Sequence, residues 1–160
     1  MTIQVGERIP SGTLHHMTEN GPEAITTGEI FDGKKVVLFA LPGAFTPTCS
    51  AKHLPGFVAK ADEIKAKGVD TIACLSVNDA FVMDAWGKDK GTGDKVLMLA
   101  DGNGDLAKAL GLDFDGSGIG FGIRSQRYAL VADDGVVSLL HVEQPMKFEV
   151  SSAEAVLAAL

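Results

Sequence analysis

Residues 36–57 read VVLFALPGAFTPTCSAKHLPGF, and this stretch decides the class of fold. Its first six residues, Val36–Leu41, form an unbroken apolar run, which is typical of a central strand covered on both faces. Apolar residues then recur at three- and four-residue spacing as far as Ile64, which predicts a helix that ends at Gly68. The Pro-Gly pair at 55–56 lies inside this helix and predicts a bend. A buried strand followed by a helix indicates an α/β protein.

The rest of the chain continues the alternation of strands and helices. We predict strands over residues 69–77, 95–100, 127–132 and 136–142, and helices after Asn78-Asp79, after the turn at 101–104, and after the capping box that runs from Ser151 to Glu154. Residues 116–122 have glycine at every second position and predict a loop. This order favours a mixed sheet with helices on both faces, built as one domain over residues 1–160.

Composition and charge exclude several classes of function. The chain has 160 residues, with 21 acidic and 14 basic side chains and a formal charge of −7. This balance argues against nucleic acid or an anionic membrane as a partner, because phosphate binding needs clustered Lys and Arg. The N-terminus shows no secretory signal, the longest apolar run is too short to cross a bilayer, and two cysteines make no disulfide scaffold. We therefore expect a cytoplasmic protein with reduced thiols.

Two further patterns suggest ligands and are set aside. Residues 102–107 fit G-x-G-x-x-A after a strand, but two aspartates would face a pyrophosphate there, and a turn that caps a helix explains the glycines. Cys49 and His53 have the spacing of a helical metal-binding pair, but structural zinc needs four ligands in recognisable pairs. We expect neither a metal nor an organic cofactor.

Cys49 is the residue on which a function most directly depends. Thr46-Pro47 is a typical helix start, with threonine as N-cap and proline at the first helical position, so Cys49 falls in the first turn. Free backbone N–H groups and the positive end of the helix dipole favour an anion there, and cysteines at such sites ionise more readily than a free thiol. The alternative is that Cys49 is a small buried hydrophobe, as most unpaired cysteines are. Its place after the carboxyl end of a central strand, where ligand sites of open α/β sheets collect, favours a reactive thiol.

The sequence around Cys49 resembles the active site of peroxiredoxins. Residues 42–49, PGAFTPTC, fit the motif P-x-x-x-T-x-x-C, and the longer string through Phe57 is similar to the type II group. Two further blocks agree with that group, residues 76–82 (SVNDAFV) and 122–128 (GIRSQRY). The resemblance covers nearly the whole chain and implies a thioredoxin-like fold.

The resemblance also implies an activity, the thiol-dependent reduction of hydrogen peroxide and organic hydroperoxides. Cys49 would attack one peroxide oxygen and become a sulfenic acid, and water or an alcohol would leave. Thr46 would turn its hydroxyl toward sulfur and substrate, and Pro42 would shield the pocket from water. Arg124 would supply a fixed positive charge, with Arg127 as the neighbouring alternative.

The resemblance leaves open how the oxidised sulfur is reduced again. Plant members have a cysteine in the block that holds Cys74, where it has been viewed as a resolving thiol. Cys74 lies in a predicted buried strand, so we expect a structural residue that would have to leave its place to form a disulfide. An external thiol would then resolve the sulfenic acid, with glutathione and glutaredoxin as the first candidate and thioredoxin as the second.

Partners and rival functions complete the prediction. Phe45 and Phe81 lie in loops near the site and suggest a homodimer contact, as in this family, although ordinary core packing is the alternative. One rival function is a redox sensor that passes peroxide oxidation to a partner without efficient turnover. Another is a cysteine hydrolase with His53 or His141 as the base, which would require an imidazole within hydrogen-bond reach of the sulfur.

Overall fold

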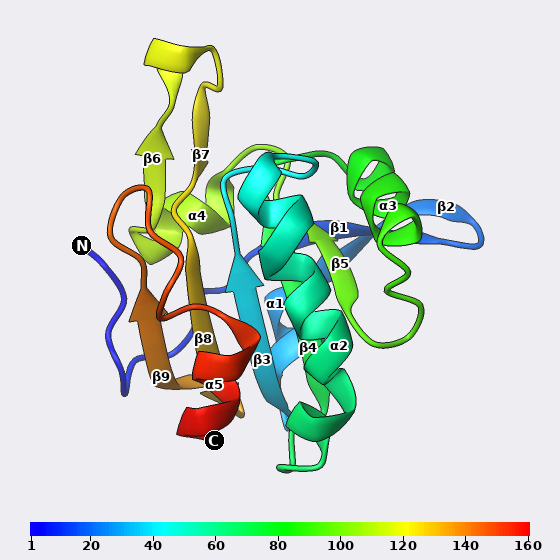
Figure 1. Cartoon of the computed structure of the whole chain (residues 1–160), viewed down its shortest axis with the longest axis vertical. Coiled ribbons are helices and arrows are strands. Elements are labelled where there is room, and N and C mark those ends of the chain that lie inside the picture. The colour runs from blue at the N-terminus through cyan, green and yellow to red at the C-terminus, as the bar shows by residue number, and fades with distance from the viewer.

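A seven-stranded mixed β-sheet forms the centre of the computed structural model, which describes residues 1–160 (Figure 1). Its strands are β1 (Thr13–Thr18), β2 (Gly21–Thr26), β3 (Lys35–Ala40), β4 (Thr71–Ser76), β5 (Leu97–Ala100), β8 (Tyr128–Asp133) and β9 (Val136–Val142). They lie in the order β2-β1-β5-β4-β3-β8-β9. β3, β4 and β5 pair in parallel, whereas the outer strands pair antiparallel with their neighbours. The prediction of a mixed sheet in a single α/β domain is confirmed.

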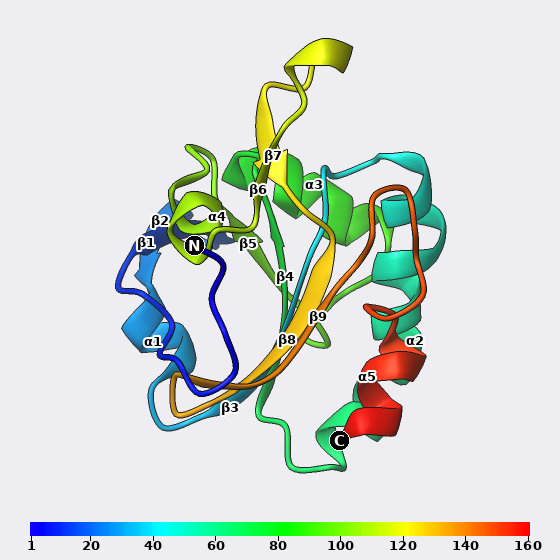
Figure 2. The ribbon, with the colours of Figure 1, turned by 90° about the vertical axis from the view of Figure 1, so that its left-hand side faces the viewer.

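Helices cover both faces of the sheet. They are α1 (Thr27–Phe31), α2 (Leu54–Lys65), α3 (Ala80–Asp89), α4 (Asp105–Leu110) and α5 (Ala153–Ala159). Figure 2 shows the sheet nearly edge-on, with α2 and α5 on one side and α1 and α4 on the other. None of these helices combines the length and the apolar character that a membrane span requires.

The alternation of side chains along β3 explains how one apolar run supports two cores. Val37, Phe39 and Leu41 point to one face, where they pack with residues of α2, α3 and α5. Val36, Leu38 and Ala40 point to the other face, where they pack with residues of α1 and α4. Successive side chains of a strand leave the sheet on opposite sides, so a strand with no polar residue must lie between two apolar layers.

Two parts of the chain differ from the prediction. The first 35 residues contain the hairpin of β1 and β2 and the helix α1; the pairing of the two strands and the helix were not predicted. The glycine-rich segment is more than a loop: β6 (Asp113–Asp115) and β7 (Ile123–Ser125) form a two-stranded ribbon whose tip is the short helix η2 (Ser117–Ile119). This ribbon projects beyond the body of the molecule (Figures 1 and 2).

Candidate active site

Cys49 lies where the loop after β3 becomes helical. Pro47 is the first helical residue, as predicted, but Cys49 then begins a π-helical turn, η1 (Cys49–His53), which precedes α2. The backbone N–H of Leu54 donates to the Cys49 carbonyl across this wider turn. The helix is therefore irregular near Pro55, but the irregular turn is the one before the proline. Pro55 itself lies at the start of α2, and it has no N–H with which to continue an α-helical hydrogen-bond pattern.

The sulfur of Cys49 is buried against an arginine. None of the Cys49 surface is exposed, and Nη2 of Arg127 donates to Cys49 Sγ at 3.0 Å. Arg127 directly precedes β8, and Tyr128 of β8 is the partner of Ala40 in the antiparallel pairing with β3. This register brings Arg127 beside the carboxyl end of β3, from which the Cys49 loop departs. The thiol is thus enclosed with a fixed cation rather than open at the surface.

Arg124, which was predicted to supply this charge, does not contact the sulfur. Arg124 lies in β7, where its Nε donates to the Phe121 carbonyl at 3.1 Å and its Nη1 donates to the Pro42 carbonyl at 3.1 Å. A Cβ at Gly43 would lie 2.6 Å from Arg124 Nη1, so this approach requires glycine. Arg124 braces the loop after β3, and the alternative arginine is the one bonded to the sulfur. The two differ because β7 ends at Ser125 and a new strand begins at Tyr128.

Thr46 and Pro42 belong to the loop that leads to Cys49 and make no hydrogen bond to its sulfur. The Thr46 hydroxyl donates to the Gly43 carbonyl at 2.8 Å, so it holds the loop rather than capping a helical N–H. Its carbonyl accepts from Ser50 N–H at 2.9 Å. No hydrogen bond joins Thr46 to the sulfur. Pro42, Thr48, Phe114, Arg127 and Phe148 are among the residues that line a cleft of about 370 Å³ in front of the site.

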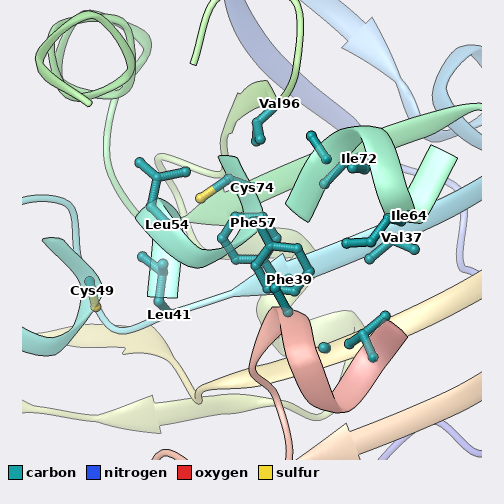
Figure 3. Close-up of a cluster of buried hydrophobic side chains, with 14 of the residues drawn as sticks. Val37, Phe39, Leu41, Cys49, Leu54, Phe57, Ile64, Ile72, Cys74 and Val96 are labelled. Carbon is teal, nitrogen blue, oxygen red and sulfur yellow. The ribbon is translucent and has the colours of Figure 1, made fainter. Parts of the chain in front are cut away.

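Cys74 lies in the interior of the sheet. It is fully buried in β4, opposite Phe39 of β3, and burial raises the pKa of its thiol well above the ordinary value. Figure 3 shows Cys74 within the apolar cluster and Cys49 on a separate segment at the margin of the view. Both cysteines are free. This environment agrees with the expectation of a structural residue.

Sequence reasoning missed the role of His53 in this geometry. Its ring is fully buried, its Nδ1 lies 2.8 Å from Arg127 Nη1, and its Nε2 lies 2.9 Å from the Ser151 carbonyl. Burial, and secondly the charge of Arg127, lower the pKa of His53 from 6.5 to about 3. Both ring nitrogens are occupied by groups other than the sulfur, and Nδ1 of His141 contacts the Val150 carbonyl. Neither histidine is bonded to Cys49, so the geometry required for a cysteine hydrolase is absent.

Asn78 is a second residue with an unforeseen role. Its side-chain Oδ1 accepts from Ala44 N–H at 3.0 Å and from the Ser76 hydroxyl at 2.6 Å. Asp79, and not Asn78, caps α3, because its carboxylate accepts from Val82 N–H at 2.8 Å. Asn78 therefore anchors the loop that leads to Cys49. The only signal for this role in the sequence was that Asn78 and Asp79 fall in residues 76–82, one of the blocks shared with type II peroxiredoxins.

Comparison with known proteins identifies the family. The Redoxin family model matches residues 4–157. The chain is 51% identical to Peroxiredoxin-2E, chloroplastic, of Arabidopsis thaliana, over 99% of this chain and 70% of that protein. It is similar to reduced Prx3 in complex with hydrogen peroxide from Vibrio vulnificus, at 56% identity and a TM-score of 0.95, with 99% of each chain covered.

Peroxiredoxin 5 from Alvinella pompejana is a more distant neighbour, at 35% identity and a TM-score of 0.87 over 98% of this chain and 97% of that one. These similarities confirm the thioredoxin-like fold that the resemblance implied. The chain therefore belongs to the redoxin family, among the type II peroxiredoxins, and is a thiol peroxidase.

Proposed function

We propose that Cys49 is the nucleophile that attacks the peroxide and that Arg127 is the cation that assists it. The observation that carries this assignment is the 3.0 Å contact between Arg127 Nη2 and Cys49 Sγ. A guanidinium remains charged at all physiological pH values, so a fixed positive charge lies within hydrogen-bond distance of the sulfur. The same group stabilises negative charge that develops on the peroxide as the O–O bond breaks.

The proposed reaction transfers two electrons from sulfur to the peroxide. The thiolate of Cys49 forms a bond with one peroxide oxygen, and the O–O bond breaks. The second oxygen leaves with its electron pair and takes up a proton, which yields water from hydrogen peroxide or an alcohol from an alkyl hydroperoxide. The sulfur is left as a sulfenic acid. Thr46 and Pro42 would shape the pocket from the loop that Asn78 anchors.

For the reductant, we propose an external thiol, with glutathione and glutaredoxin ahead of thioredoxin. The burial of Cys74 in a central strand supports this choice, because a disulfide requires Cα atoms within about 7 Å and suitable side-chain directions. Cys74 would have to leave the sheet to meet Cys49. A small thiol can instead approach through the cleft lined by Arg127 and Phe148.

We also propose that the protein acts as a homodimer. Phe45 and Phe81 are 51% and 66% exposed, and the Phe45 ring lies 6.3 Å from that of Trp86, which belongs to the same helix as Phe81. Large aromatic side chains that remain exposed near one another are typical of protein interfaces.

Stopped-flow measurements with hydrogen peroxide and an alkyl hydroperoxide test the assignment of the nucleophile. The wild type should consume both peroxides, and Cys49→Ser should consume neither. Sustained turnover with glutathione and glutaredoxin, compared with thioredoxin, identifies the reductant and separates a peroxidase from a redox sensor. Cys49→Ser with normal turnover would remove the basis of the proposal.

A further inference from the structure

The arginine at the sulfur is held in place by a ring of hydrogen bonds that closes through four residues. From the Arg127 carbonyl the ring passes to Glu143, whose backbone N–H donates to it at 3.0 Å. Oε2 of Glu143 accepts from Ser151 N–H at 2.8 Å and from the Ser151 hydroxyl at 2.7 Å. The Ser151 carbonyl then contacts His53, and His53 contacts the guanidinium of Arg127. Both the backbone carbonyl and the guanidinium of Arg127 therefore belong to this ring of hydrogen bonds.

The chemistry of the partners fixes the form of His53 in this ring. A guanidinium has only donors, so Nδ1 of His53 must accept from Arg127 Nη1. The Ser151 carbonyl has only lone pairs, so Nε2 must carry the proton and donate it. The imidazole is therefore neutral, with its proton on Nε2. A protonated imidazole would present a second N–H to the arginine and break the ring at this point.

The carboxylate of Glu143 holds the loop that encloses the arginine. Besides Ser151, its Oε2 accepts from Glu149 N–H at 2.8 Å, and the side chain is nearly buried. Hydrogen bonds from Ser151 and Glu149 lower the pKa of Glu143 against the opposing effect of its burial. One carboxylate thus ties together residues 143–151, which we call the covering loop.

Phe148 of the covering loop packs against both the Arg127 guanidinium and the His53 ring. The Arg127 guanidinium carbon lies 5.9 Å from the centre of the Phe148 ring, and the His53 ring meets Phe148 edge-on at 5.1 Å. Arginine loses much rotamer freedom when it is fixed, so a guanidinium that must stay against a sulfur needs such support. The support comes from three segments that are distant in the sequence: η1, the start of β8 and the covering loop.

We propose that His53 and Glu143 are positioning residues for the peroxidase reaction, which they serve by fixing the Arg127 guanidinium against the Cys49 sulfur. The inference rests on the proposed function, in which Cys49 is the nucleophile and Arg127 its cation. Neither His53 nor Glu143 touches the sulfur, so each acts through the arginine.

Single-turnover oxidation by hydrogen peroxide, followed by stopped flow, tests this proposal. His53→Leu removes both hydrogen bonds of the ring nitrogen atoms and should slow oxidation by about 10- to 100-fold, the usual loss when a reacting group is misplaced by about 1 Å. His53→Gln supplies an acceptor and a donor and should recover most of the rate. Glu143→Gln should also slow oxidation, because a neutral amide oxygen accepts the three hydrogen bonds at the Oε2 position more weakly than a carboxylate oxygen does.

The decisive comparison is made in the Arg127→Gln background. If His53 acts through the arginine, His53→Leu slows oxidation in the wild type and adds nothing once Arg127 is Gln. An equal loss in both backgrounds, or no loss in the wild type, would overturn the proposal. Cys49→Ser is run alongside: if it stays active, the proposed nucleophile is wrong, whereas a dead Cys49→Ser with a fully active His53→Leu contradicts the positioning role alone.

A control variant separates positioning from folding. Asp101 is also a buried carboxylate that accepts backbone N–H groups, from Leu106 and Ala107 of α4, so Asp101→Asn matches Glu143→Gln in kind. It should lower thermal stability and leave the oxidation rate unchanged. A rate that His53→Gln restores, together with an unchanged rate in Asp101→Asn, is a result that a purely structural role of His53 would not give.

Discussion

Arg124 and Arg127 are three residues apart and have different partners. Arg127 reaches the buried sulfur, whereas Arg124 bonds to two carbonyl groups of neighbouring loops. A charge that contacts the reacting atom stabilises the transition state directly, and one that holds a loop acts only through geometry. A comparison of the two side chains therefore measures how much the contact between Arg127 and the sulfur contributes to the rate of oxidation.

Replacing the two arginines by glutamine should give unequal losses. Arg127→Gln should lower the second-order rate constant for hydrogen peroxide by about 100-fold or more, since it removes the charge at the sulfur. Arg124→Gln should lower it by less than about 10-fold, because the charge at the sulfur stays in place. Stopped-flow oxidation of both variants measures the difference. A larger loss in Arg124→Gln would contradict the assignment.

His53 should make the stability of the fold depend on pH. The pKa of His53 is lowered to about 3 in the folded chain, whereas an unfolded chain titrates near 6.5. Below pH 6.5 the unfolded state binds a proton at His53 that the folded state does not bind. The free energy of unfolding is therefore highest above pH 6.5 and falls as the pH is lowered toward 3. Between pH 7 and pH 5 this residue should cost about 2 kcal/mol.

Urea denaturation at pH 7 and pH 5 measures that cost. His53→Gln does not titrate, so its free energy of unfolding should fall less between the two pH values than that of the wild type. Equal losses in the two proteins would show that His53 is accessible to protons.

Among the elements, the loop between β3 and η1 is tied to the segment after β4 by the side-chain amide of Asn78. Asn78 Oδ1 receives the Ala44 N–H and the Ser76 hydroxyl, which lie on the two segments that meet at the carboxyl edge of the sheet. Asn78→Ala leaves both donors without this partner. The free energy of unfolding should fall by about 1–3 kcal/mol, and peroxidase activity should fall with it.

The neighbouring residue supplies the control for this change. Asp79→Ala removes the cap of α3, which should cost about 1 kcal/mol and leave the loop in place. Chemical denaturation and initial peroxidase rates of both variants separate the two effects. Activity that follows stability equally in both variants would argue against a special role of the loop.

The elements that could be predicted from the sequence are those with a strong local pattern. The apolar run of β3 and the helix and strand signals that follow it predicted the order of elements from residue 36 to residue 142, except for the ribbon of β6 and β7. The pairing of the N-terminal hairpin was not predicted because Leu14 is the only buried residue of β1 and β2, so their apolar pattern is weak. The capping box was misplaced by one residue: Ser152 caps α5, and the Ser151 hydroxyl is used by Glu143.

Most of the candidate site could be predicted, except for the residues that meet only through the fold. Cys49 and its loop follow from a helix start after a buried strand and from the peroxiredoxin motif. Arg127, rather than Arg124, meets the sulfur because of the register of β8 against β3. No local sequence pattern predicts how two strands align when 87 residues, from 41 to 127, lie between them. The ring through His53 and Glu143 depends on the closure of the covering loop, which has no periodic signal.

At the scale of the whole molecule, Phe45 and Phe81 provide the test of the proposed homodimer. Both side chains are more than half exposed. Phe81→Glu places a charge in an apolar contact and should shift the solution mass from dimer to monomer. Val5→Glu is the control, since Val5 is 59% exposed on the N-terminal segment and should leave the mass unchanged. Analytical ultracentrifugation distinguishes these outcomes, and a wild type that is monomeric at all concentrations would contradict the proposal.

The ribbon of β6 and β7 lies between two parts of the chain that each carry some of the active-site residues. A backbone cut at η2, at the tip of the ribbon, would leave Cys49 and His53 on the first fragment and Arg127, Glu143 and Ser151 on the second. The two fragments would share the β3–β8 ladder as their common border. Neither piece would carry a sulfur and its cation together, so peroxide consumption by a mixture of separately produced halves would be a direct assay of their complementation.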